Sequence, residues 1–159
     1  MFVAIRGSRA NVRQHFQSPL EFRRERATVC IMFCEFKELT GLTVTVDKVC
    51  YMPHLEAPAD RPYPFVYYIT IHNESDETVT IKGRKWVVRD EDANCIVVEG
   101  DGVVGKFPRL EPGDEFSYDS YHTVACDSVA EGSFFGVSED GTPVLTRIPK
   151  FKLKLSDCC

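Results

Sequence analysis

Residues 65–81 decide the fold, and they read FVYYITIHNESDETVTI. Apolar side chains alternate at Phe65, Tyr67, Ile69 and Ile71, and the alternation resumes at Val79 after a polar break. This period of two is typical of strands that bury one face. The break at residues 73–77 consists of Asn, Glu, Ser, Asp and Glu, which favour turns. The segment therefore predicts two antiparallel neighbouring strands joined by a hairpin-like turn.

The same texture extends in both directions from this segment. Upstream, Leu42, Val44 and Val46 share one face of an expected strand, and residues 52–62 form a loop whose three prolines exclude a central strand. Downstream, Gly83 stands where a bulge bends the chain into residues 86–89, and residues 90–94 turn it into residues 95–98. Further strands are expected around residues 116–118, 134–137 and 150–155.

The sequence predicts an all-β fold of about seven short strands. Turns recur every 8 to 15 residues and helical periodicity is nearly absent, as in an immunoglobulin- or fibronectin type III-like antiparallel β-sandwich. A small barrel is the alternative. In the last strand Phe151, Leu153 and Leu155 alternate with lysines, and we expect those lysines to protect a sheet edge.

Length and composition divide the chain into an extension and one domain. The 159 residues suit a single domain, which we place at residues 41–157. Residues 1–40 are predicted to be a partly disordered N-terminal extension rich in arginine. An organelle transit peptide and a start-site artefact stay open as alternatives. Within the extension, residues 29–36 are apolar enough to pack on the domain as a short strand or helical turn.

Charge and cysteine usage narrow the class of protein. The net charge is -5. Residues 1–40 hold seven Lys and Arg against four Glu, whereas residues 41–159 are acidic, so we do not expect the domain to bind nucleic acid. No apolar run approaches the roughly 20 residues of a membrane helix, which predicts no membrane insertion. Seven cysteines without Cys-x-x-Cys spacing indicate free thiols in a reducing cytoplasm.

A glycine-rich stretch, Glu99 to Pro108, is the main candidate for a binding site, and we call it the glycine loop. Its glycines could let backbone N–H groups converge on a phosphate or another anion while nearby cations supply charge. The candidate residues are Gly100, Gly102, Gly105, Lys106, Arg84 and Arg109. Two prolines, Pro108 and Pro112, prevent the helix that a dinucleotide fingerprint requires. The alternative is a hairpin loop whose glycines only supply positive φ, and Glu99 and Asp101 inside the stretch would repel a phosphate.

Three blocks in order give the chain a family resemblance over about residues 41–157. They are Arg84-x-Trp86, then a block from Gly100 to Ser120 with Gly102-Val103-Val104-Gly105, Pro108, Leu110, Pro112-Gly113, Phe116 and Tyr118, and finally Ile148-Pro149-x-Phe151-x-Leu153. Together they resemble the ApaG family. The chain departs from the usual bacterial pattern at Lys85, where His is common, and at Phe134 and Val137, where Met and Tyr are common.

The resemblance implies a fibronectin type III-like sandwich, no established enzyme activity and no cofactor. Family members occur as small bacterial proteins, often described as cobalt and magnesium efflux proteins, and as domains of F-box proteins and of a DNA polymerase delta-interacting protein. We therefore expect a non-enzymatic binding or regulatory protein with a protein partner. A phosphate, pyrophosphate or nucleotide ligand in the glycine loop is the alternative function, and a homo-oligomer is also open.

Two other kinds of chemistry are less well supported by the sequence. The potential metal ligands lack the spacing that is characteristic of a metal site. The residues Ser120, His122 and Asp127 could form a catalytic triad, but the sequence shows only that they are near one another along the chain. We predict neither. The available metal ligands are His54, His72, His122, Glu56, Asp60, Asp76 and Asp119.

Overall fold

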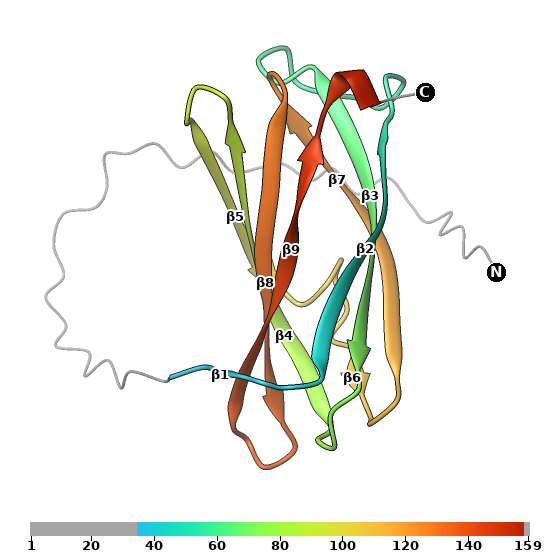
Figure 1. Ribbon diagram of the computed structural model, residues 1–159, viewed down its shortest axis with the longest axis vertical. Coiled ribbons are helices and arrows are strands. Elements are labelled where there is room, and N and C mark those ends of the chain that lie inside the picture. Colours follow the sequence, from blue (N-terminus) through green and yellow to red (C-terminus); the bar gives the residue numbers. More distant parts are fainter. Residues whose placement is uncertain (1–34, 158–159) are drawn as a thin grey trace, which may run out of the picture. The chain divides into compact units, whose positions relative to one another are not determined.

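Two sheets pack face to face in the computed structural model, which describes residues 35–157 (Figure 1). The larger sheet, sheet A, contains β1 (Lys37–Glu38), β4 (Val79–Asp90), β5 (Cys95–Asp101), β6 (Arg109–Leu110), β8 (Ser128–Ser138) and β9 (Pro143–Leu153). Sheet B contains β2 (Leu42–Tyr51), β3 (Tyr63–Asn73) and β7 (Glu115–Val124). The predicted all-β sandwich is confirmed, and two of its nine described strands are only two residues long.

Strand β4 pairs with β8 on one side and with β5 and β6 on the other. Sheet A runs β1-β9-β8-β4-β5, with β6 also paired to β4, and sheet B runs β2-β3-β7. Strands β5 and β6 therefore lie one after the other along the same side of β4, and the glycine loop connects them. All pairings are antiparallel except that of β1 with β9, which is parallel.

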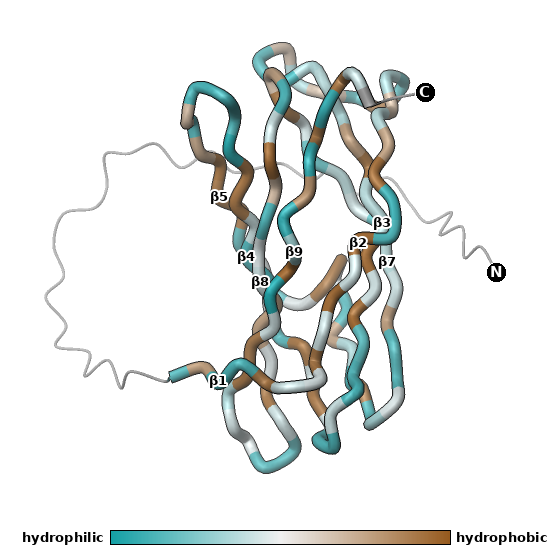
Figure 2. The backbone as a smooth tube through the Cα atoms, in the orientation of Figure 1, coloured by the Kyte–Doolittle hydropathy of each residue, from teal (hydrophilic) through white to brown (hydrophobic). Residues whose placement is uncertain are grey.

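The hydrophobic core lies between the two sheets. The predicted inward residues Phe65, Tyr67, Ile69 and Ile71 of β3 are each at most 1% exposed. The ring of Tyr67 packs against that of Trp86 of β4, which is also 1% exposed. Figure 2 shows the alternation of apolar and polar residues along β9, where Phe151 and Leu153 are buried and Lys152 is exposed. The strands form where one face of the alternating pattern can be removed from water.

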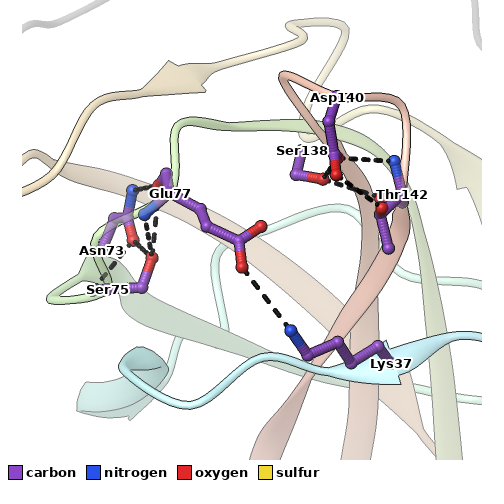
Figure 3. Close-up of polar contacts among 7 residues, drawn as sticks. All are labelled: Lys37, Asn73, Ser75, Glu77, Ser138, Asp140 and Thr142. Carbon is purple, nitrogen blue, oxygen red and sulfur yellow. Dashed lines mark hydrogen bonds and ion pairs between the residues drawn. The ribbon is translucent and has the colours of Figure 1, made fainter.

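The predicted hairpin between residues 71 and 79 is wrong. Strand β3 pairs with β2 and β7, whereas β4 pairs with β5, β6 and β8, so residues 74–78 cross from one sheet to the other. The buried side chain of Asn73 holds this crossing, because its Nδ2 donates to the carbonyls of Glu77 and Leu110. Its Oδ1 accepts hydrogen bonds from the N–H and the hydroxyl of Ser75 (Figure 3).

Other details of the sequence prediction have mixed outcomes. The bulge before Gly83 is confirmed by the register shift between Ile81 and Gly83. Strand β9 does form an edge beyond the two residues that β1 covers, with Lys152 exposed on it. Leu155, however, starts a short 3-10 helix, η1 (Leu155–Asp157), instead of continuing the strand. Most of the segment 29–36, predicted to pack on the domain, lies outside the described residues.

Candidate functional site

The glycine loop contains a tight turn at residues 103–106. Val103 and Lys106 exchange backbone hydrogen bonds of 2.8 and 3.0 Å, and the two residues between them have positive φ, 48° at Val104 and 74° at Gly105. Two consecutive positive φ values identify a type I′ turn. The turn is joined to β4 by a 2.7 Å hydrogen bond from the N–H of Gly102 to the carbonyl of Lys82. The predicted positive φ of the glycines is therefore correct for Gly102 and Gly105.

Side chains of the loop divide between the core and the surface. Val103 is fully buried and anchors the loop in the core, whereas Val104 and Phe107 are each 54% exposed. The ammonium of Lys82 lies 5.9 Å from the centre of the Phe107 ring. Val104 is a β-branched residue in the left-handed region, which is a strained conformation for such a side chain. The loop thus holds two apolar side chains in water on a fixed backbone.

Arg84 is the predicted cation that the structure does bring to the loop. Its Nη1 donates hydrogen bonds to the carbonyls of Asp101, at 2.9 Å, and Gly102, at 3.1 Å. Gly100 faces Arg84 across the β4–β5 ladder and leaves room for the guanidinium. Arg84 therefore braces the loop from within by binding its carbonyl oxygens.

The remaining predicted anion ligands are arranged differently. Arg109 is bound to Glu111 and Glu139, which raise the pKa of its guanidinium. Within the loop, the N–H groups of Gly102, Val103 and Lys106 donate to backbone carbonyls. Those of Val104 and Gly105 make no backbone hydrogen bond within residues 35–157. The described geometry leaves these two donors at the tip of the loop.

A cluster of aromatic and polar side chains near Arg84 was not predicted as a unit. His122 lies 5.2 Å, centre to centre, from the rings of both Tyr67 and Trp86, and Arg84 is near enough to act on its charge. Burial and the cation of Arg84 lower the pKa of His122 to about 4, so its imidazole is neutral at pH 7. Burial also raises the pKa of Tyr67 to about 12. The signal in the sequence is the alternation of Phe116, Tyr118, Ser120 and His122, which places all four on the inner face of β7.

Tyr118 contributes the most unusual polar atom of this cluster. Its hydroxyl is buried and has no hydrogen-bond partner among the described residues. Burial raises the pKa of this phenol, and the neighbouring Tyr67 raises it further. The ring packs edge-on against Phe134, at 6.1 Å between centres. Phe134, one of the departures from the family pattern, is fully buried.

Asp127 and His72, two of the residues considered for a triad or a metal site, have other partners in the structure. Asp127 accepts a hydrogen bond from the backbone N–H of Leu155, whereas His122 packs against Tyr67 and Trp86. His72 lies on the outer face of sheet B beside Thr45 and Glu115. No group of three or more potential metal ligands occurs within residues 35–157, and the same part of the chain contains no helix that is long and apolar enough to cross a membrane.

Comparisons with known proteins agree with this fold. The family model for the ApaG domain matches residues 53–137. Protein ApaG of Vibrio cholerae is 37% identical over 106 residues, which cover 65% of this chain and 82% of the relative. Protein ApaG of Ralstonia nicotianae is 36% identical over 115 residues, covering 72% of this chain and 92% of the relative.

A solved structure shares the architecture as well. A crystal structure of a protein described as ApaA from Bordetella pertussis superposes with a TM-score of 0.65 at 30% identity, covering 76% of this chain and 97% of that one. The described domain is thus a two-sheet sandwich with a braced glycine loop on one edge. The chain belongs to the ApaG family.

Proposed function

We propose that this protein is a non-enzymatic binding module that presents the glycine loop to a protein partner. The observation that carries the proposal is the exposure of Val104 and Phe107, each 54%, on a loop fixed by hydrogen bonds and by the buried Val103. Apolar and aromatic side chains that are already held in place bind with little loss of conformational entropy.

The conformation of Val104 supports this interpretation. Asparagine or glycine would adopt its positive φ with less strain than valine. Strained residues cluster at functional sites, where the surrounding structure holds them in place and the strain serves the function. A valine at this position gives the loop an apolar tip at the expense of stability, as expected of a residue that contacts a partner.

Site-specific photo-crosslinking tests the proposal. A benzophenone amino acid replaces Phe107 in one protein and Tyr121 in another, because both are aromatic and about half exposed, at 54% and 52%. Tyr121 lies on β7, outside the glycine loop. In a lysate of the source cells, position 107 should yield a discrete protein adduct that position 121 does not. The same adducts at both positions, or adducts at neither, would overturn the role of the loop.

A small anion is the second candidate ligand for the loop. The N–H groups of Val104 and Gly105, with no backbone acceptor in the described chain, and the adjacent Lys106 favour phosphate or pyrophosphate at the tip. Titration with pyrophosphate should then shift the amide resonances of residues 102–106 at submillimolar concentration. A spectrum that stays unchanged to millimolar pyrophosphate would remove this candidate.

The efflux of cobalt and magnesium linked to the family also fits a binding protein. We propose that any effect of this chain on metal transport passes through a partner in the cytoplasm, since a β-sandwich of this kind has no route for an ion across a bilayer. Calorimetry with Co²⁺ and Mg²⁺ checks this directly: tight binding of either ion to the purified chain would contradict it.

A further inference from the structure

Strand β5 is an end strand of sheet A. It pairs with β4 on one side, and no strand among residues 35–157 pairs with its other side (Figure 1). The glycine loop begins within the last three residues of β5 and continues to Pro108. An end strand exposes backbone donors and acceptors that another strand can use.

The direction of these backbone groups follows from the hydrogen bonds at the two ends of β5. Asp90 donates to the carbonyl of Asn94 at 3.1 Å, and Gly102 donates to that of Lys82 at 2.7 Å. In an antiparallel ladder, hydrogen-bonded and non-hydrogen-bonded pairs alternate. The even-numbered residues from 94 to 102 therefore face β4, and the N–H groups of Cys95, Val97, Glu99 and Asp101 point outward.

The first half of β5, Cys95 to Val98, lacks the protection found on the other sheet edges. The β2 edge carries a bulge between Val46 and Lys48, and the β9 edge carries Lys152. Strand β7 carries Glu115 and Asp119 on its outer face. Strand β5 pairs with β4 in regular register, contains no proline or lysine, and begins with four consecutive apolar residues, Cys95 to Val98. Val97 is 52% exposed and Val98 is 37% exposed.

The charges around β5 select the kind of strand that fits. The turn before it carries Asp90, Glu91 and Asp92, and its far end carries Glu99 and Asp101. A groove of about 530 Å³ on sheet A adjoins that end, between these two carboxylates and the rings of Phe36 and Phe135. The edge thus presents an apolar centre between two acidic ends.

This charge pattern argues against a second copy of the same strand. Antiparallel pairing of two β5 strands would bring the acidic turn of one copy beside Glu99 and Asp101 of the other, and parallel pairing would align like carboxylates. Like charges across a strand pair are destabilising. Lys85 offsets only Glu99, to which it is bound at 2.8 Å.

We propose that β5 is a strand-addition site for an extended segment of a partner protein that has an apolar centre flanked by lysine or arginine. Backbone hydrogen bonds to residues 95, 97, 99 and 101 supply the register, and the two acidic ends supply the charge selectivity. This inference rests on the proposed binding function and names the chemistry of the partner for the edge beside the glycine loop.

The test uses a capped peptide of sequence KKTVTVTKK and its acidic counterpart EETVTVTEE. In the full chain, the basic peptide should slow amide hydrogen exchange at Cys95, Val97, Glu99 and Asp101 at least tenfold, while the acidic one should not. Equal protection by both peptides, or protection on β2 or β7, would overturn the proposal. If β5 becomes protected without peptide as the protein concentration rises, and light scattering shows dimers, the edge binds a second copy instead.

Two sets of variants make the result specific. Val97→Pro removes an outward N–H and no bond to β4, so it should weaken the basic peptide at least tenfold, while Val97→Thr keeps the N–H and the affinity. Should Val97→Pro fail to fold, the double variant Glu91→Lys with Asp92→Lys decides, because it should weaken the basic peptide and strengthen the acidic one. If neither set of variants changes peptide binding while crosslinking from position 107 persists, strand addition is ruled out. The proposed function of the glycine loop then remains.

Discussion

The guanidinium of Arg84 occupies the space next to Gly100 where any other residue would place a side chain. A Cβ atom on Gly100 would lie 3.0 Å from Nη1 of Arg84, and that same Nη1 binds two carbonyls of the glycine loop. Because Gly100 has no side chain, Arg84 has room to bind the carbonyls of the glycine loop. The glycines of this family block have a role in packing that is separate from any ligand.

Substitution of Gly100 tests this brace. Gly100→Ala should push the guanidinium away, lower the free energy of unfolding by about 1 to 2 kcal/mol, and speed amide exchange in residues 102–106, because two charge-assisted hydrogen bonds weaken. Gly83→Ala is the matched control, since a Cβ there meets only an ordinary contact at 3.4 Å. Unchanged loop exchange in Gly100→Ala would show that Arg84 does not hold the loop.

Gly102 and Gly105 should differ sharply in their tolerance of alanine. Both have positive φ, but a Cβ on Gly102 would lie 2.2 Å from the carbonyl oxygen of Lys106, whereas one on Gly105 meets nothing within 4 Å. Gly105→Ala should therefore lose only about 1 kcal/mol for its backbone conformation, and Gly102→Ala at least about 2 kcal/mol more. Chemical denaturation of both variants measures the difference, and equal losses would contradict the clash.

Val104→Asn separates stability from binding. Asn-Gly is the preferred pair for a type I′ turn, so the variant should gain about 1 kcal/mol in unfolding free energy. It should at the same time reduce the crosslinked adduct formed from position 107, because the apolar tip is lost. A stabilised variant that keeps its partner fully would remove Val104 from the contact surface.

Stability should fall as the pH drops from about 6.5 to about 4. The pKa of His122 is about 4 in the folded chain and about 6.5 when unfolded, so between these values the unfolded state binds the extra proton. The loss should reach about 2 to 3 kcal/mol near pH 4. His122→Gln should flatten the curve between pH 5 and 6.5, where few carboxylates titrate. The wild-type slope persisting in that variant would assign the effect to other groups.

The hydroxyl of Tyr118 should be dispensable or unfavourable. Because it is buried without a partner in the described chain, Tyr118→Phe should leave stability unchanged or raise it by about 1 kcal/mol. Tyr67→Phe is the variant for comparison, because the hydroxyl of Tyr67 does have a polar neighbour: it lies 3.4 Å from Nε2 of His122. A clear loss of stability in Tyr118→Phe would reveal a hydrogen bond to that oxygen.

Strand existence was predictable from the sequence, but strand pairing was not. The alternation of Phe65 to Ile71 identifies β3 because burial of one face is a local property. The destination of β4 depends on Asn73, whose amide reaches Leu110, a residue 37 positions later. A run such as Asn-Glu-Ser-Asp-Glu favours a turn in either case, so contacts between distant residues decide between a crossing and a hairpin.

The local features of the candidate site were also predictable from the sequence, whereas its contacts between strands were not. The positive φ of Gly102 and Gly105 and the approach of Arg84 to the loop follow from residue chemistry and spacing. That Arg84 would bind carbonyls, and that Arg109 would turn to Glu111 and Glu139, depends on the β4–β5 and β4–β6 registers. Whether the six predicted residues hold an anion stays a prediction.

The order of the strands has a consequence for synthesis on the ribosome. Sheet B is incomplete until β7 ends at Val124, and sheet A until β9 ends at Leu153, since β1 pairs with β9 across more than 100 residues. Contacts between such distant segments slow folding, because a long loop must close before they form. The nascent chain therefore exposes the apolar β5 segment well before its sheet is finished.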